Sequence, residues 1–139
     1  MNFENELEFW VNQAQEDLHC FPDENAIESV KNLFKSLHSQ NLLHWYCDKD
    51  KKGIMVYCIT PDFRGGMCVN ELFMYIKPES RGRIRLFKEL VNHLEQVAEE
   101  NNCKSVRIAS NIGYDDQKVL RVLKLFGYET DVVVKYIGE

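Results

Sequence analysis

Residues 68–98 constrain the fold more than any other part of the sequence, because they join a strand directly to a long amphipathic helix. Residues 68–76 are mainly β-branched, aromatic and aliphatic, which is typical of a strand, and Pro78 ends it. A short apolar run at 106–110 follows the helix and predicts a β-α-β unit whose two strands are parallel neighbours. Beyond Gly82 the apolar side chains recur every three or four residues, as on one helix face: Ile84, Phe87, Leu90, Val91, Leu94, Val97 and Ala98.

The rest of the sequence predicts further helices and strands on both sides of this unit. A charged stretch that ends in Gly53 separates two apolar runs and suits the loop of an antiparallel hairpin. Gly127 takes the position expected just beyond the end of a helix. The predicted helices cover 5–19, 24–38 and 119–126, and the predicted strands cover 42–47, 53–60 and 132–137.

Length and charge exclude several classes of protein. A chain of 139 residues is the size of one domain, so we expect residues 1–139 to share a single core. The net charge of −5 argues against sequence-independent binding of nucleic acid, which needs a surplus of lysine and arginine. No apolar run approaches the roughly 18 residues of a membrane span, and the acidic N-terminus is unlike a secretory signal. We therefore expect a cytoplasmic protein that does not bind membranes.

The cysteines and histidines suggest no metal site. The five cysteines are widely spaced, without a CxxC pair or a histidine at ligand spacing, so we expect reduced thiols and no metal. Cys58 and Cys68 lie in strand-like sequence and are interpreted as small buried hydrophobic residues, with a thiol nucleophile as the alternative. His93 is expected on the flank of the long helix, and His44 could face a substrate cleft.

The junction between strand and helix is the candidate site. A helix N-terminus presents unpaired N–H groups and partial positive charge, so it favours an anion. Arg81, Arg83 and Arg85 lie in or just before the first turn, where the helix dipole would prefer acidic residues. Together with Gly82, which allows close approach of the backbone, they suit a pyrophosphate. A basic, solvated helix end is the alternative, and the window alone does not separate the two.

Two segments resemble motifs of the GNAT superfamily of acetyltransferases. Residues 76–82, Ile-Lys-Pro-Glu-Ser-Arg-Gly, resemble the V-x-P-E-x-R-G start of the family's coenzyme A loop. Residues 123–128, Leu-Lys-Leu-Phe-Gly-Tyr, resemble its Y-x-x-x-G-F segment. The resemblance covers residues 54–137 and implies an α/β (α+β) fold. Its central sheet would be mixed and mostly antiparallel, with a splayed pair of parallel strands and flanking helices.

The resemblance also implies an activity, which is transfer of an acetyl group from acetyl-CoA to a primary amine of a small molecule or protein. The backbone of Met74, Tyr75 and Ile76 would pair with the pantetheine arm. The turn amides would hold the pyrophosphate; these residues are Arg81, Gly82, Arg83, Ile84, Arg85 and Leu86. The last strands of such folds often pair across dimers, so the edge at 132–134 makes a homodimer possible.

Three residues depart from the family's pattern. Ile84 and Leu86 stand where the family's loop has small residues, and Leu123 stands where its acid tyrosine is usual. These departures motivate an alternative function, a catalytically impaired GNAT-like fold that binds coenzyme A, a nucleotide or a protein partner. The acidic net charge slightly favours a cationic acceptor such as a polyamine, a lysine side chain or an aminoglycoside.

The proton carriers are less defined. Glu71 is the first candidate for the general base. Counted back from Ile76, it lies one residue from the position usual in the family, so its side chain would take the family's face of the sheet only if a β-bulge compensates. Asn70 competes for that position, and Glu71 could instead be an exposed or ion-paired carboxylate. Tyr114 is the candidate acid for the thiolate of coenzyme A, and otherwise a loop tyrosine. Water chains could replace a dedicated base.

Overall fold

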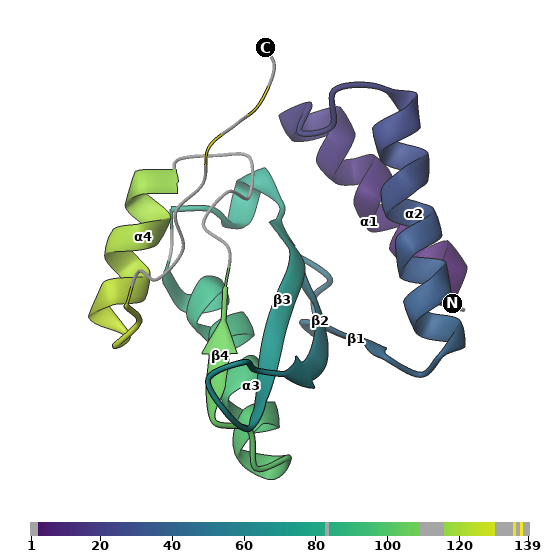
Figure 1. The fold of residues 1–139 in the computed structure, drawn as a ribbon. Helices are drawn as coiled ribbons and strands as arrows, with labels where there is room; N and C mark the ends of the chain where they lie inside the picture. The colour runs from purple at the N-terminus through teal and green to yellow at the C-terminus, as the bar shows by residue number, and fades with distance from the viewer. Residues whose placement is uncertain (1–2, 83, 109–115, 130–134, 136, 138–139) are drawn as a thin grey trace.

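A computed structural model describes residues 3–82, 84–108, 116–129, 135 and 137. Within them a mixed sheet carries helices on both faces (Figure 1). This α/β architecture confirms the expected GNAT-like fold class. In chain order the elements are α1 (Phe3–Leu18), α2 (Glu24–Ser39), β1 (Leu43–Cys47), β2 (Gly53–Pro61), β3 (Met67–Ile76), the 3₁₀ turn η1 (Pro78–Ser80), α3 (Ile84–Glu100), β4 (Ser105–Arg107) and α4 (Asp116–Leu125).

The sheet has the strand order β1-β2-β3-β4. β1 with β2, and β2 with β3, are antiparallel pairs, whereas β3 and β4 are parallel and are joined through α3. The predicted hairpin and β-α-β unit are therefore confirmed. The hairpin loop is fixed by Asp48, whose Oδ1 accepts hydrogen bonds from the backbone N–H groups of Lys52 and Gly53 at 2.7 and 2.8 Å.

The parallel pair is short. Cys68, Val69 and Asn70 of β3 pair with Ser105, Val106 and Arg107 of β4, while β3 continues to Ile76. Figure 1 shows β4 beside only one end of β3. Beyond Asn70, no described strand pairs with this side of β3, as expected for the splayed pair of strands that the resemblance implies.

A β-bulge interrupts β3 where this splay begins. Val56 pairs with Phe73, but the next residue, Tyr57, pairs with Glu71, so Leu72 is an extra residue in β3. Because side chains alternate along a strand, the extra residue changes which face each residue before it occupies. Glu71 thereby takes the same face as Tyr57.

Two hydrophobic cores hold the helices against the sheet. α1 and α2 pack on one face, where Trp10 and Tyr75 are 1% and 0% exposed. α3 and α4 pack on the other face around Met74, Leu90 and Leu123. Figure 1 shows the two helix pairs on opposite sides of the sheet. The apolar spacing in the sequence predicted these faces because each amphipathic helix buries its apolar stripe.

Helix ends follow from local chemistry. The Asp23 side chain caps α2 by accepting a hydrogen bond from the N–H of Ala26 at 2.9 Å. Gly127 ends α4 with φ of +94°, and the N–H of Tyr128 reaches the carbonyl of Leu123 at 3.0 Å, which is the geometry of a Schellman cap. α4 begins at Asp116, three residues earlier than predicted. The predicted strand at 132–137 lies almost entirely outside the described residues, as do 109 and 110.

None of the helices in the described ranges is long and apolar enough to span a membrane. All five cysteines are free thiols; Cys58 and Cys68 are buried in strands, as predicted.

Candidate functional site

The candidate site lies where β3 passes into α3. The N–H of Lys77 bonds to the carbonyl of Lys52 at 2.8 Å, so pairing with the β1–β2 loop continues just beyond β3. The turn η1 follows, and the N–H of Arg81 closes it on the carbonyl of Pro78 at 3.2 Å. Gly82 has φ of +82°, a conformation that favours glycine, and a Cβ there would meet no atom within 4 Å. Glycine is therefore favoured here by backbone conformation and not by crowding.

The start of α3 is electrostatically suited to an anion. Its first N–H groups have no acceptor within the helix, and its first turn contains no acidic residue. Arg85 is exposed there. Arg83 lies outside the described residues. This end of α3 thus combines the positive end of a helix dipole with an accessible guanidinium group.

The two large residues of the turn behave differently. Ile84 is 50% exposed. Leu86 is half-buried and packs against the core beneath α3, and its Cδ2 lies 3.2 Å from the position that a Cβ on Gly53 would take. Leu86 is therefore turned into the protein. Of the two departures from the family's small residues, Ile84 is the one that remains at the surface of the turn.

Arg81 does not point along α3 but toward α1. Its guanidinium forms an ion pair and hydrogen bond with the Asp17 carboxylate, in which each side chain is only about one-fifth exposed, at 20% and 19%. The hydroxyl of Tyr75 donates to the same oxygen, Asp17 Oδ2, at 2.9 Å. The guanidinium carbon also lies 5.4 Å from the centre of the Tyr75 ring. We call these three residues the Asp17 network.

The pKa values in this network are consistent with fixed protonation states. Burial would raise the pKa of Asp17, but the hydrogen bonds from Arg81 and Tyr75 and the charge of Arg81 lower it overall. Burial, together with the hydrogen bond to Asp17, raises the pKa of Tyr75 to about 12. At neutral pH Asp17 is therefore a carboxylate and Tyr75 a protonated phenol.

The strand residues expected to meet the pantetheine arm are buried. Met74, Tyr75 and Ile76 are at most 3% exposed and pair on one side with β2. Their other side faces the splay beyond the described part of β4.

Glu71 and Asn70 lie on opposite faces of the sheet. Glu71 is half-buried and shares its face with Tyr57, its cross-strand partner. Asn70 faces the other way, and its amide donates to the hydroxyl of Thr60 at 2.5 Å. Tyr114 lies outside the described residues. The bulge at Leu72 puts Glu71 on the face of Tyr57, opposite to the face that it would take in a regular strand.

Tyr128 does not substitute for the acid tyrosine that the family has at the position of Leu123. Leu123 is 4% exposed in the core between α3 and α4. The hydroxyl of Tyr128 donates to Glu95 at 2.8 Å, and burial together with this bond holds the pKa of Tyr128 well above its usual range. Tyr128 is therefore engaged in packing α4 on α3.

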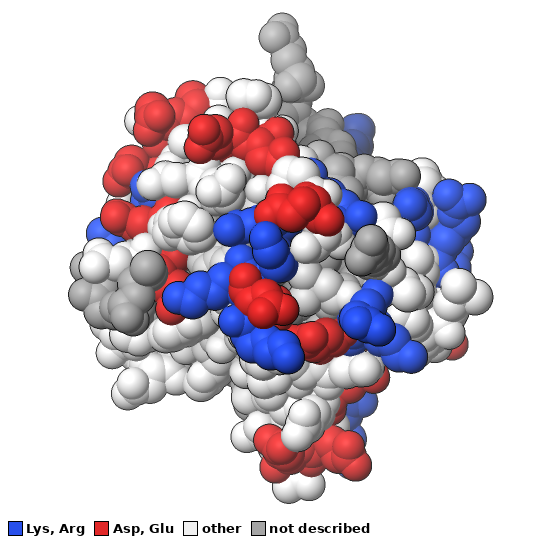
Figure 2. Space-filling model, turned by 180° about the vertical axis from the view of Figure 1, so that it is seen from behind, with Lys and Arg blue, Asp and Glu red and all other residues white. Residues whose placement is uncertain are grey.

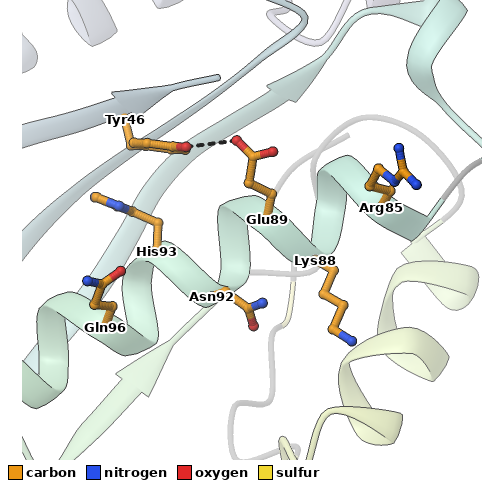
Figure 3. A pocket seen from close by; sticks show the side chains of 7 residues that line it. All are labelled: Tyr46, Arg85, Lys88, Glu89, Asn92, His93 and Gln96. Carbon is orange, nitrogen blue, oxygen red and sulfur yellow. Dashed lines mark hydrogen bonds between the residues drawn. The ribbon is translucent and has the colours of Figure 1, made fainter. Parts of the chain in front are cut away.

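A cluster that the sequence did not predict joins β1, β2 and α3 (Figure 3). Tyr46 stacks on His93 with ring centres 4.1 Å apart, and its hydroxyl donates to Glu89 at 2.7 Å. This bond and burial raise the pKa of Tyr46 to about 12. The Tyr57 hydroxyl lies 3.2 Å from His93 Nε2, and burial lowers the pKa of His93. The sequence shows that Glu89 and His93 are four residues apart on one helix face. It does not show that Tyr46 and Tyr57 meet them, because this depends on the register of β1 against β2.

An open pocket of about 600 Å³ runs along α3 beside this cluster. Figure 3 shows Arg85 and Lys88 at one end and the Tyr46–His93 stack at the other. The pocket lies toward the β1 edge of the sheet, and Arg85 is the one predicted site residue that lines it. Among the described residues, no group of three histidine, cysteine, aspartate or glutamate side chains could hold a metal ion.

The loop between β2 and β3 lies at the opposite end of β3 from the turn. Asp62 ties this loop to β4, because its carboxylate accepts hydrogen bonds from the Arg64 N–H, the Ser105 hydroxyl and the Arg107 guanidinium at 3.0, 3.2 and 3.4 Å. The Arg64 N–H is the main cause that lowers the pKa of Asp62. The β2–β3 loop is thus anchored to the parallel strand pair.

The fold is that of known acetyltransferase structures, although no protein-family model and no curated protein sequence matches the chain. A structure of a predicted acetyltransferase with acetyl-CoA from Clostridium acetobutylicum has a TM-score of 0.70 and 17% identity, over 99% of this chain and 92% of that one. A structure of AAC(6')-Iy with the bisubstrate analogue CoA-S-monomethyl-acetylneamine has a TM-score of 0.67 and 18% identity, over 100% and 95%.

A third similar structure has a different description. It is a transcriptional regulator from Bacillus halodurans C-125, with a TM-score of 0.73 and 16% identity, over 99% of this chain and 96% of that chain. At these identities the similarity concerns the fold. The chain has the GNAT-like fold over essentially its whole length.

Proposed function

We propose that this protein is an acetyl-CoA-dependent N-acetyltransferase that acts on a primary amine. The observation that carries the proposal is the strand that continues past its parallel partner and leads into a helix without acidic residues in its first turn. Such a junction offers backbone partners for an extended arm and a positive helix end for a pyrophosphate. The similar structures that contain acetyl-CoA or a coenzyme A analogue support this ligand.

In the proposed complex, the pantetheine arm pairs with the backbone of residues 74–76, and the pyrophosphate meets the turn amides of residues 81–86. Arg85 and Arg83 add positive charge near the phosphates. The amine nitrogen attacks the thioester carbonyl, the carbon–sulfur bond breaks, and the thiolate leaves. The amine must lose a proton and the thiolate must gain one. We assign the first role to Glu71, directly or through water, and the second to Tyr114.

The acceptor class is proposed from charge. Figure 2 shows acidic side chains gathered at its upper left, over the end of the molecule where α1 and α2 meet. In the sequence this end contains Glu16, Asp17, Asp23 and Glu24. Apart from Asp17, which is paired with Arg81, these side chains are exposed and attract a cationic molecule such as a polyamine, a lysine side chain or an aminoglycoside.

Calorimetric titration with acetyl-CoA tests binding, and mass detection of acetylated products from spermidine, a lysine peptide and an aminoglycoside tests transfer. Product masses are preferable to a thiol reagent because Cys20 is an exposed free thiol. We expect micromolar binding and one acetyl group per turnover. Absence of both heat and thermal shift at millimolar acetyl-CoA would refute the proposal, and binding without any product would reduce it to a coenzyme-binding fold.

Glu71→Gln separates the catalytic role from binding. We expect turnover to fall by about 10²-fold or more while acetyl-CoA affinity stays the same, because a general base acts on the proton and not on coenzyme binding. Glu99→Gln, on the exposed surface of α3, removes the same charge and serves as the control. Equal turnover in the two variants would exclude Glu71 as the base.

A further inference from the structure

We propose that Asp17 is a positioning residue for coenzyme binding, which acts by holding Arg81 and thereby the turn between β3 and α3. This inference rests on the proposed function, because it concerns how the same turn is made ready for a phosphate. Asp17 lies on α1, far from the turn in sequence, and no motif pointed to it.

The position of Asp17 is unfavourable for the helix itself. It lies in the last turn of α1, which contains no basic residue, although the partial negative charge at a helix C-terminus favours cations there. The carboxylate is offset by partners outside the helix: the Arg81 guanidinium and the Tyr75 hydroxyl share its Oδ2 atom. The Asp17 network therefore serves the junction and not α1.

The Asp17 network holds the chain on both sides of η1, at Tyr75 and at Arg81. Tyr75 is the penultimate residue of β3 and is fully buried, and Trp10 of α1 packs edge-on against its ring with centroids 6.0 Å apart. Arg81 ends η1 through its backbone N–H, and its side chain lies over the same Tyr75 ring. Next comes Gly82, whose backbone has the widest conformational freedom of any residue. Without the anchor at Arg81, the chain between η1 and α3 would sample more conformations.

The geometry distinguishes two roles for Arg81. A guanidinium that binds phosphate directly would be directed at the start of α3. Its removal would lower the affinity for coenzyme A in a salt-dependent way. The observed guanidinium is instead directed at α1, with four-fifths of the side chain covered. Its charge is already matched by Asp17. Arg81 then contributes by orienting backbone N–H groups, and Asp17 is needed for the same purpose.

The test measures coenzyme A affinity by calorimetry at two salt concentrations in wild type, Asp17→Asn, Arg81→Gln and the double variant. Glu8→Gln, which removes one exposed carboxylate elsewhere on α1, is the matched control. We expect each network variant to bind coenzyme A roughly tenfold more weakly, with the salt dependence of the wild type, and the double variant to be no weaker than Arg81→Gln alone. The control should bind as wild type does.

Hydrogen exchange of residues 77–87 in the ligand-free protein provides a second measurement, with faster exchange expected in Asp17→Asn than in the control. Tyr75→Phe removes only one donor and serves if Asp17→Asn does not fold. All affinities are measured well below the unfolding midpoint, so a loss of stability alone would leave them unchanged. A purely structural role for Asp17 would thus shift the midpoint without weakening binding.

Three outcomes would overturn the inference. Unchanged or tighter binding by Asp17→Asn would show that Asp17 does not prepare the turn. Additive losses in the double variant, with reduced salt dependence in Arg81→Gln, would show that Arg81 binds phosphate directly. Failure of the wild type to bind coenzyme A would refute the proposed function itself, which distinguishes that failure from a failure of the positioning role.

Discussion

Arg85→Glu should make the protein more stable and its coenzyme binding weaker. Arg85 is the second residue of α3, is exposed, and lies in a first turn without acidic residues. A glutamate at this position interacts favourably with the helix dipole, whereas an arginine does not. If the same helix end holds a pyrophosphate, the substitution replaces attraction of the ligand by repulsion. The two effects have opposite signs because they depend on different partners.

The expected magnitudes follow from simple electrostatics. Replacing a cation by an anion in the first turn should raise the free energy of unfolding by about 0.5–1 kcal/mol at low salt. Two unit charges about 6 Å apart interact by roughly 0.7 kcal/mol in water and about 2.8 kcal/mol at an effective dielectric constant of 20. Reversing the charge doubles that difference, so acetyl-CoA affinity should fall at least about tenfold.

Urea unfolding measures the stability, and calorimetry measures the affinity at about 50 and about 250 mM salt. These concentrations lie roughly two- to threefold below and above about 0.1 M, where the Debye length is about 10 Å. Lys35→Glu on exposed α2 produces the same change in net charge on the far face of the sheet and should leave affinity unchanged. Arg85→Gln should give about half of each effect. If Arg85→Glu bound acetyl-CoA as tightly as wild type, the phosphates would lie elsewhere.

Two further predictions follow from burial at the site. Leu86→Ala should lower the free energy of unfolding by about 1–2 kcal/mol without improving coenzyme affinity, because Leu86 packs inward. Ile84→Ala should lower the free energy of unfolding by less than about 1 kcal/mol, since Ile84 is 50% exposed, and should tighten coenzyme binding if its side chain crowds the turn. Urea unfolding and calorimetry measure both variants. Tighter binding by Leu86→Ala alone would contradict the conclusion that Leu86 packs inward while Ile84 lies at the surface of the turn. Because burial lowers the pKa of His93, its neutral form is favoured in the folded state, so stability is fully present above the unfolded pKa of about 6.5 and is lost as the pH falls toward the folded pKa. His93→Gln should therefore lose less stability between pH 7.5 and 5.5 than wild type does, with exposed His19→Gln as the control, and equal losses in all three would contradict the prediction.

The sequence predicted the fold well because its signals were local. The spacing of apolar residues identified both faces of α3, and the charged, glycine-ended loop identified the β1–β2 hairpin. The order of strand, basic turn, amphipathic helix and a further short apolar run at 106–110 was enough to indicate the parallel pair. These features depend on neighbours three or four residues away, or on the alternation along one strand.

The contacts within the candidate site could not be predicted in the same way. Asp17 and Arg81 are separated by 64 positions, and nothing in either segment indicates that α1 ends beside the turn. The stack of Tyr46 on His93 depends on the register of β1 against β2 and on the rotation of α3. Both Arg81 and Leu86 were placed in the site by motif position, but their side-chain directions depend on packing around Tyr75 and Gly53.

The bulge at Leu72 connects the sequence argument to the chemistry. In an unbulged strand the residues sharing a face with Met74 and Ile76 would include residue 72, and Glu71 would lie on the opposite face with Tyr75. The extra residue instead aligns Glu71 with Tyr57. The half-buried carboxylate therefore lies on the α3 face, at the point where β3 separates from β4. A count along the sequence alone could not show this, because the face that Glu71 takes depends on one extra residue in β3 that only the pairing with β2 reveals.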